Sequence, residues 1–550
     1  MVPSKQRISI SRALIGTGLA LGLVAAPASG QSGAQAITRE FYPDDPLLHD
    51  PPPHSVKHVK KQDVDDLYDF LDNSFATPRR EGKEARIGPH PALDVNTLGD
   101  VPDSSWYTNR HYYHRMSIEE LKRGPGNSAP PAKGTWRVVS AKTNGVTPGF
   151  VIEDELKNRY VLKLDPPDYP ELPSAADVIG SKAFYALGYN TPENYIVHFR
   201  RENLEIPPGV IWRDRSGKKH PLTSRMLDEM LRVQPKRADG TWRGMASRLI
   251  GGELAGPFRY RGTRSDDPND TIPHESRRVL RGLEVFAAWL NHHDTKAINS
   301  MDSLIEENGR RYLKHYLLDF GDILGSDGVN PKYAWSGHQY TIESKSTLVG
   351  MLTFGLDVPR WERAKYPGFK GVGRFDSWSF DPLSWKPNYP NPAFLLMDSA
   401  DAFWAAKQVA AFTDAEIRAL VETGEYSDPR AAEWIARSLI ERRDKIAGAW
   451  FSTVLPVDKF RILDGKLVFD DLDAARDIGK RCEYEVRWAS QDSSGAVTSL
   501  AGAVGRDLPA RHTDTRYLIA TVKKSGDDAR LISVYLCRRE GGVEIVGVDR

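Results

Sequence analysis

The feature that most constrains the fold of this chain is a pair of short polar motifs separated by a predicted β-hairpin. Residues 292–299 read HHDTKAIN, and residues 319–321 read DFG directly after the apolar run 316–318. Between the two motifs, residues 306–311 read EENGRR, which is typical of a hairpin turn. A hairpin returns the chain toward its start, so the strand before DFG is expected to bring Asp319 alongside the first motif.

The residue types in these motifs suit phosphoryl transfer. That reaction needs metal ions between the β- and γ-phosphates, an acceptor held in line, and positive charge on the phosphates. Asp294, Asn299 and Asp319 offer the hard oxygen ligands that Mg²⁺ or Mn²⁺ prefers. Each residue alone has an ordinary structural explanation, since Asp294 could cap a turn, Asp319 could end a strand and His292 could be a core histidine. The combination at this spacing resembles the phosphoryl-transfer centre of protein kinases.

The first motif resembles the catalytic loop of protein kinases. His292 matches the leading histidine of that loop, and His293 replaces its usual arginine. The resemblance implies that Asp294 meets the acceptor hydroxyl and that Lys296 faces the γ-phosphate. It also implies that Asn299 and the aspartate of DFG bind the metal ions.

The segment upstream of this motif contains a candidate cation for the phosphates. Three strand-like runs between residues 135 and 164 follow one another closely, which predicts a β-meander. Lys163 lies in the last run, YVLKL, and resembles the strand lysine that reaches the α- and β-phosphates in kinases. An exposed strand lysine is the alternative. On the helix predicted next, Asp177 could be the acidic partner of Lys163, the N3 residue of a capping box begun by Ser174, or both.

The glycine loop departs from the kinase pattern, because no G-x-G-x-x-G motif is present. Residues 140–149 read SAKTNGVTPG and lie between the first two predicted strands, where a phosphate-covering loop belongs. Gly145 and Gly149 allow close approach of the backbone to phosphate, and Lys142 could touch it. A plain hairpin loop explains the same residues.

The resemblance covers about residues 134–450 and is closest to atypical kinase-like proteins, such as the HipA-like, CotH-like and secreted Fam20-like groups. It implies an α+β fold with a two-lobed core, in which the N-lobe is β-rich and the C-lobe is helical. The domains that we expect are a signal peptide (1–36), an extended N-terminal arm (37–133), the N-lobe (134–262), the C-lobe (263–455) and a small β-rich domain (456–550).

Several helices are predicted within and near the helical lobe. Apolar residues at helical spacing predict one helix over 275–290. Thr413 with Glu416 predicts a capping box, and Asp428 followed by Pro429 predicts another helix start. Before these helices, the acidic residues of segment 265–275 are expected to form a solvated loop, with a calcium site as the alternative.

The first residues indicate export. A basic start is followed by the uncharged apolar run 13–26 and by small residues, which is the order of a secretory signal peptide with a cut after Gly30 or Ala36. An uncleaved membrane anchor is the alternative, although the run is short for a span. We therefore expect a secreted or periplasmic protein without a transmembrane segment in its mature chain.

The composition limits the partners. The net charge of +1 gives no large electrostatic footprint for nucleic acid. The chain has two cysteines, Cys482 and Cys537, which could form a bridge in an oxidising compartment or remain as buried thiols.

The sequence thus predicts an exported, metal-dependent phosphotransferase. It would use ATP or another nucleoside triphosphate with Mg²⁺ or Mn²⁺, and its acceptor would be a hydroxyl on a protein, glycan, lipid or small molecule. The alternative is a pseudokinase, a non-catalytic kinase-like binding module at the cell surface or in the periplasm. An unrelated hydrolase lacks support, because neither a G-x-S-x-G elbow nor an H-E-x-x-H pair occurs.

Overall fold

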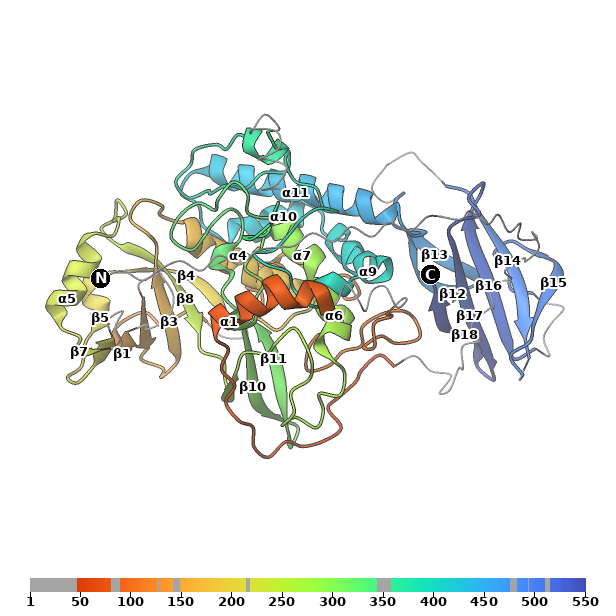
Figure 1. Cartoon of the computed structure of the whole chain (residues 1–550), viewed down its shortest axis with the longest axis horizontal. Coiled ribbons are helices and arrows are strands. Elements are labelled where there is room, and N and C mark those ends of the chain that lie inside the picture. The colour runs from red at the N-terminus through yellow and green to blue at the C-terminus, as the bar shows by residue number, and fades with distance from the viewer. Residues whose placement is uncertain are drawn as a thin grey trace, which may run out of the picture. The chain divides into compact units, whose positions relative to one another are not determined.

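The computed structural model describes residues 47–80, 90–126, 129–141, 149–213, 218–343, 358–474, 482–492, 494–509 and 515–550. The predicted signal peptide and two of the predicted phosphate-loop residues, Lys142 and Gly145, lie outside these ranges. Residues 41–550 belong to one compact unit. The fold is of the mixed α+β type (Figure 1).

A six-stranded sheet carries Lys163, with strand order β4-β8-β3-β2-β1-β5. Its strands are β1 (Trp136–Ala141), β2 (Gly149–Glu153), β3 (Arg159–Leu164), β4 (Asn194–Phe199), β5 (Leu204–Glu205) and β8 (Trp242–Arg248). Strands β1, β2 and β3 pair antiparallel in succession, so the predicted meander is confirmed. Alternate side chains of β3, Tyr160 and Leu162, are fully buried, because successive residues of a strand point to opposite faces.

Helix α4 (Leu172–Ala186) follows the meander and packs against the DFG segment. Its N-cap is Glu171, which has a φ of 71° and makes no capping hydrogen bond through its side chain. The predicted capping box begun by Ser174 is therefore wrong. Instead, Ser174 lies in the first turn of the helix, and its hydroxyl donates to Asp165, before the helix, at 2.8 Å.

Gly180 sets how closely α4 approaches the DFG segment. A Cβ atom on Gly180 would lie 2.6 Å from both Phe320 Cβ and Ile323 Cδ1. We expect Gly180→Ala to lower the free energy of unfolding by about 1–3 kcal/mol, because the added methyl group overpacks this contact. The matched control is Gly448→Ala in α11 (Pro429–Phe451), where the added Cβ meets no atom within 4 Å and the expected change is a gain of up to about 1 kcal/mol. Urea unfolding of both variants measures the difference, and equal stability of the two would contradict the packing that we describe.

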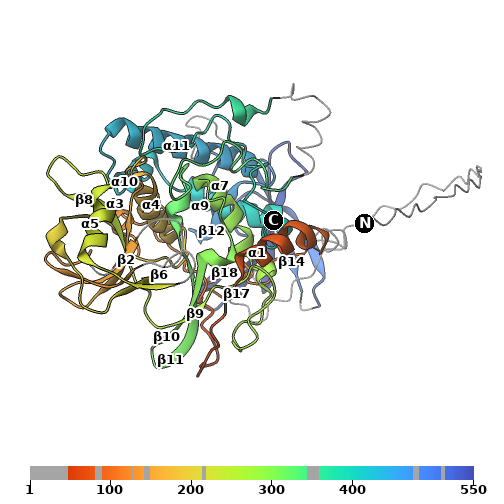
Figure 2. The ribbon, with the colours of Figure 1, turned by 60° about the vertical axis from the view of Figure 1, so that its left-hand side comes forward.

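A three-stranded sheet, ordered β11-β10-β9, joins the two polar motifs. It contains β9 (Glu253–Gly256), β10 (Ser300–Glu307) and β11 (Arg310–Leu317), which lie side by side in Figure 2. Strands β10 and β11 form the predicted hairpin, with Ser300 opposite Leu317. Its turn residues Asn308 and Gly309 both have positive φ, which is typical of a type I′ turn. The hairpin prediction is confirmed.

The helix predicted over 275–290 is broken into three pieces: a 3₁₀ turn (His274–Ser276), α6 (Arg278–Arg281) and α7 (Leu283–Leu290). The break between α6 and α7 falls at Gly282. A Cβ atom there would lie 2.7 Å from Trp404 Cζ3, so tertiary packing against the indole shapes this junction. Helical periodicity persists through the break, which is why the sequence pattern does not reveal it.

The remaining helices of the apolar core are α9 (Ser399–Ala410), α10 (Asp414–Glu422) and α11 (Pro429–Phe451). The capping box of Thr413 with Glu416 and the Asp428 cap before Pro429 are both present, as predicted. Smaller elements are α1 (Asp66–Leu71) with the π-helix Asp72–Ala76, α3 (Ile118–Arg123), α5 (Ser224–Arg232), β6 (Ile211–Arg213) and β7 (Lys219–Pro221).

The acidic segment 265–275 is not a solvated loop, so that prediction is wrong. Asp267 and Asp270 are buried. The carboxylate of Asp270 pairs with His274 at 2.8 Å and with Arg277 at 2.9 Å. Basic partners close in the sequence permit this burial, because a buried carboxylate needs paired charge or hydrogen-bond donors.

The last part of the chain is β-structure. Strands β12 (Val457–Leu463) and β13 (Lys466–Asp471) form a hairpin, and a five-stranded antiparallel sheet follows in the order β15-β14-β16-β17-β18. Its strands are β14 (Tyr484–Gln491), β15 (Val497–Val504), β16 (Tyr517–Lys524), β17 (Leu531–Arg539) and β18 (Gly542–Asp549). Cys482 and Cys537 are both free thiols. Among the described helices, none combines the length and the apolar character that a membrane span requires.

Candidate active site

Lys163 on β3 is the centre of the candidate site. Its ammonium Nζ lies 2.9 Å from Oδ2 of Asp177 on α4 and 2.7 Å from Oδ1 of Asp319 in the DFG motif. The Asp177 side chain is 3% exposed, whereas that of Asp319 is 54% exposed. Thus one carboxylate holds the lysine from inside the protein, and the other faces solvent.

The two carboxylates decide the charge of Lys163. Burial disfavours its ammonium form, but Asp177 and Asp319 outweigh burial and raise the pKa of Lys163. The lysine therefore stays positively charged at physiological pH and can meet an anionic ligand. Of the two roles that the sequence left open for Asp177, the structure contains the pairing with Lys163 and excludes the capping box.

The loop after α7 carries Asp294, whose carboxylate is held from two sides. The side-chain amide of Asn299 donates to Oδ2 at 2.8 Å, and the amide of Asn388 donates to Oδ1 at 2.8 Å. Lys296 Nζ lies 3.1 Å from the same Oδ1. Burial disfavours the charged form of Lys296, but Asp294 and then Asp66 raise the pKa of Lys296 above its ordinary value. The loop thus presents one fixed carboxylate beside one ammonium group.

Asn388 is a site residue that the sequence did not reveal. It comes from the loop-rich region after residue 322, more than ninety positions from Asp294, and no motif surrounds it. The backbone N–H of Asn388 also donates to the carbonyl oxygen of His293 at 2.7 Å, which fixes Asn388 against the loop that carries Asp294.

The DFG segment is anchored by its phenylalanine. Phe320 is fully buried, and its ring stacks on that of Phe184 of α4 with centroids 5.0 Å apart. His292 completes this cluster, with its ring centroid 5.9 Å from that of Phe320. Asp319 itself has φ 57° and ψ 62°, a left-handed conformation that turns the chain between β11 and the next 3₁₀ helix. Through these contacts, α4 and the loop before Asp294 fix the position of Asp319.

His292 gives the site a measurable pH dependence. Burial lowers the pKa of His292 to about 4, well below the usual value near 6.5 of an unfolded chain. Between these values the unfolded state binds more protons than the folded state, so stability falls as pH drops from about 6.5 toward about 4. We expect this histidine to remove about 2 kcal/mol of stability between pH 7 and pH 5.

The test compares wild type with His292→Phe, which keeps an aromatic ring beside Phe184 and Phe320 but cannot be protonated. Between pH 7 and pH 5, the unfolding free energy of wild type should fall by about 2 kcal/mol more than that of the variant. Urea denaturation at both pH values measures it. A difference that does not change with pH would contradict a neutral, buried His292.

The charged residues of the site face one cavity of about 360 Å³. Lys163, Asp177, Asp294, Lys296 and Asp319 all line it, together with Asn388, Asp322 and Asp327. Asn299 does not line the cavity directly and touches Asp294 instead. Gly149 lies opposite Lys163 in the β2–β3 ladder without lining the cavity.

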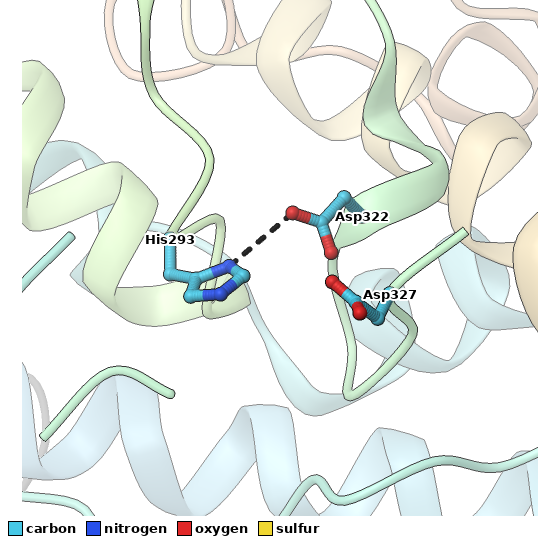
Figure 3. Close-up of side chains that lie close together, drawn as sticks. All are labelled: His293, Asp322 and Asp327. Carbon is cyan, nitrogen blue, oxygen red and sulfur yellow. Dashed lines mark ion pairs between the residues drawn. The ribbon is translucent and has the colours of Figure 1, made fainter. Parts of the chain in front are cut away.

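Beside this cavity, His293, Asp322 and Asp327 gather their ligand-type atoms within 4.8 Å of one another (Figure 3). This cluster already contains a cation, because the fully buried ammonium of Lys332 lies 2.6 Å from Asp322 and contacts His293. Burial opposes ionisation of Asp322, but Lys332 and His293 outweigh burial and hold the pKa of Asp322 well below its usual value. We therefore interpret His293, Asp322 and Lys332 as an ion-pair network that supports the turn after the DFG motif, and Asp327 makes no ion pair among the described residues.

The donor set of the cavity fits a divalent metal with a phosphate ligand. Carboxylates of Asp319, Asp294 and Asp327 line it, and hard carboxylate oxygens are the preferred ligands of Mg²⁺ and Mn²⁺. The amide nitrogen of Asn299 is used by Asp294, which leaves its oxygen as the ligand atom that the residue could offer. The sequence predicts Asp319 and Asn299 as metal ligands; Asp327, which no motif marks, is a further carboxylate that lines the cavity.

Comparisons with known proteins give little further guidance. No family model matches the chain, and no curated protein matches it. Among solved structures, two crystal structures of the Golgi casein kinase are similar, one of them with Mn/ADP bound. Both are 10% identical to this chain. The match with the Mn/ADP complex covers 73% of this chain and 94% of the kinase chain, with a TM-score of 0.27. The match with the other structure covers 74% of this chain and 96% of the kinase chain, with a TM-score of 0.28. A likeness at this level carries no argument about function.

Proposed function

We propose that this chain is an exported, metal-dependent phosphotransferase with a kinase-like core, which moves the γ-phosphate of ATP or another nucleoside triphosphate to a hydroxyl acceptor. One observation carries the proposal. Lys163 Nζ lies 2.9 Å from Asp177 and 2.7 Å from Asp319, in the cavity that Asp294 and Lys296 also line. Residues from four separate segments thus converge in the combination that phosphoryl transfer needs.

The nucleotide phosphates would meet Lys163. Its ammonium group would hold the α- and β-phosphates, while the buried carboxylate of Asp177 keeps the lysine charged and oriented. Gly149, opposite Lys163 on β2, leaves room for close approach of a phosphate to the backbone. Lys142 and Gly145 belong to the same proposed loop.

Asp319 and Asn299 would hold Mg²⁺ or Mn²⁺, with Asp327 as a further carboxylate of the same cavity. When bound, the metal neutralises negative charge on the β- and γ-phosphates. The 54% exposure of the Asp319 side chain suits this role, because a fully buried carboxylate could not meet a hydrated ion.

In the transfer step, the acceptor oxygen bonds to the γ-phosphorus while the bond from that phosphorus to the β,γ-bridging oxygen breaks. Asp294 would receive the proton of the acceptor hydroxyl, and the nucleoside diphosphate would leave. Asn299 and Asn388 hold the carboxylate of Asp294 from both sides, so little reorganisation is needed before the transfer. Lys296 beside it would stabilise the charge that develops on the transferring group.

The proposal includes export, because the first 36 residues have the order of charges and apolar residues of a signal peptide. The acceptor would then be met outside the cytoplasm. Its chemical class is not part of the proposal beyond the hydroxyl that accepts the phosphate.

The proposal predicts that ATP raises the melting temperature of the protein when Mn²⁺ or Mg²⁺ is present, and that EDTA abolishes the increase. Ligand at a hundred times its Kd stabilises a folded protein by about 2.7 kcal/mol. Asp319→Asn should lose the metal-dependent part of this effect, because an amide is a weaker ligand than a carboxylate for these ions. The measurement is a thermal melt with and without metal.

The pseudokinase alternative gives a different result in the same samples. A non-catalytic module would be stabilised by nucleotide or by a cell-wall glycan but would release no nucleoside diphosphate on long incubation. An unchanged melting temperature with every nucleotide and metal would contradict the phosphotransferase, and an unchanged melting temperature with cell-wall glycans as well would contradict both interpretations of the cavity.

A further inference from the structure

A second cavity, of about 310 Å³, shares no lining residue with the first. Its walls come from the end of α4, the chain after β8, strand β11 and the segment around Arg110. Three cationic side chains line it: Arg110, Arg248 and Lys314. The cavity does not depend on the proposed function for its chemistry.

Arg110 is held in place before any ligand arrives. One of its terminal nitrogens donates to the carbonyl oxygens of Tyr185 and Tyr189, at 2.9 and 3.0 Å. Its guanidinium also lies over the Tyr185 ring, 3.9 Å from the centroid. An arginine fixed in this way loses little conformational entropy when its other N–H groups bind an oxyanion.

Lys314 is the unsatisfied member of the group. Within the described part of the chain, its ammonium makes no hydrogen bond or ion pair, although the side chain is half-buried. Burial lowers the pKa of Lys314, attraction to Glu307 opposes that effect, and a smaller repulsion from Arg110 adds to it. A half-buried ammonium group without a hydrogen-bond partner is costly, and a bound anion would remove that cost.

The acidic groups around the cavity do not neutralise these cations. Glu193 is the carboxylate among the lining residues, and it accepts a hydrogen bond from Tyr195 at 2.8 Å. Oε2 of Glu193 lies 4.0 Å from a terminal guanidinium nitrogen of Arg248, at the outer limit of an ion pair. Arg248 also donates to Asn158 at 3.1 Å. The lining therefore carries three positive side chains against one negative side chain.

We infer that this cavity binds the tetrahedral oxyanion of a small phosphorylated or sulfated molecule. Arginine and lysine N–H groups are the usual donors to such oxygens, and the charge-assisted hydrogen bonds that they form are the strong ones. The volume accommodates an oxyanion together with a ring of about monosaccharide size, and Tyr185 and Tyr316 supply aromatic walls for it.

The location would link this ligand to the first cavity. Arg248 ends β8, the strand that pairs with the Lys163 strand, and Lys314 lies in β11, which leads into Asp319. A bound oxyanion would bridge the sheet that carries Lys163 and the sheet whose strand β11 leads into Asp319.

The experiment titrates inorganic phosphate, glucose 6-phosphate and glucosamine 6-sulfate into the full chain by calorimetry, with EDTA present. We expect saturable binding of at least one probe, and Lys314→Met should weaken it by at least about tenfold, since a charged hydrogen bond contributes about 1.5–3 kcal/mol. Lys219→Met, an exposed lysine of strand β7, is the matched control and should bind like wild type.

Stability gives an independent readout of the same inference. In a buffer without oxyanions, Lys314→Met should melt at a higher temperature than wild type, because it removes a half-buried charge beside Arg110. The binding probe should reverse this order by stabilising wild type alone.

The inference is overturned if no probe binds wild type at millimolar concentration, or if Lys314→Met binds as tightly as wild type. Tighter binding of a sugar ester than of inorganic phosphate would identify an organic ligand, and equal binding would identify the free ion.

Discussion

We expect Asp294→Asn to lower the rate of nucleoside diphosphate release from the metal–nucleotide complex by about a hundredfold or more, while nucleotide affinity stays close to that of wild type. A positioned proton acceptor contributes typically about 10²–10⁴ to a rate, and an amide cannot take the proton. The side chain lines the cavity but lies outside the Lys163 ion pairs, so the substitution leaves the phosphate-binding cation in place.

The assay measures release of the diphosphate from ATP with Mn²⁺ or Mg²⁺, with water or an added alcohol as the acceptor. The matched control is Asp464→Asn in the turn between β12 and β13, where the residue is exposed and has positive φ, which asparagine tolerates. Wild-type rates in Asp294→Asn would contradict the role of this carboxylate. Loss of folding, checked by circular dichroism, would be visible separately from loss of rate.

Lys163→Met should have the second large effect, and it should act on both binding and stability. Removing the ammonium leaves the carboxylate of Asp177, 3% exposed, without its cation. Breaking a buried pair in this way typically costs about 3–5 kcal/mol, because an uncompensated buried charge remains. Nucleotide binding should be lost at the same time, because no cation remains for the phosphates.

The double variant Lys163→Met/Asp177→Asn separates the two effects. Neutralising Asp177 removes the buried charge, so most of the lost stability should return, as it does when both members of a buried pair are replaced. Nucleotide binding should stay absent in the double variant. Urea unfolding and nucleotide titration of the single and double variants form the test. Recovery of binding together with stability would show that Lys163 is only a structural residue.

The sequence predicted those parts of this site that depend on local motifs. The hairpin between the motifs follows from its Asn-Gly turn, and closing it brings Asp319 near the loop of Asp294. Lys163 was found because a lysine flanked by apolar residues lies at the end of a meander. Asp177 was found as one of two alternatives, since a single carboxylate near a helix start fits a cap and an ion pair equally well.

Other parts were beyond a sequence argument, because they depend on contacts between distant segments or on the direction in which nearby side chains turn. Asn388 reaches Asp294 from a loop without periodicity, and Lys332 pairs with Asp322 across ten residues of irregular chain. The break at Gly282 depends on an indole more than a hundred residues away. Asp270 can be buried because the side chains of His274 and Arg277 turn toward it, and the order of residue types does not show which way those side chains turn.

The most direct test of the central claim is a crystal structure of the protein with Mn²⁺ and a non-hydrolysable ATP analogue, using the anomalous signal of manganese. We predict a manganese peak in contact with the carboxylate of Asp319, with the phosphates of the analogue within hydrogen-bond distance of Lys163 Nζ and the acceptor side open toward Asp294. A cleft that stays free of metal and nucleotide at saturating concentrations, or a nucleotide bound elsewhere on the chain, would contradict the assignment.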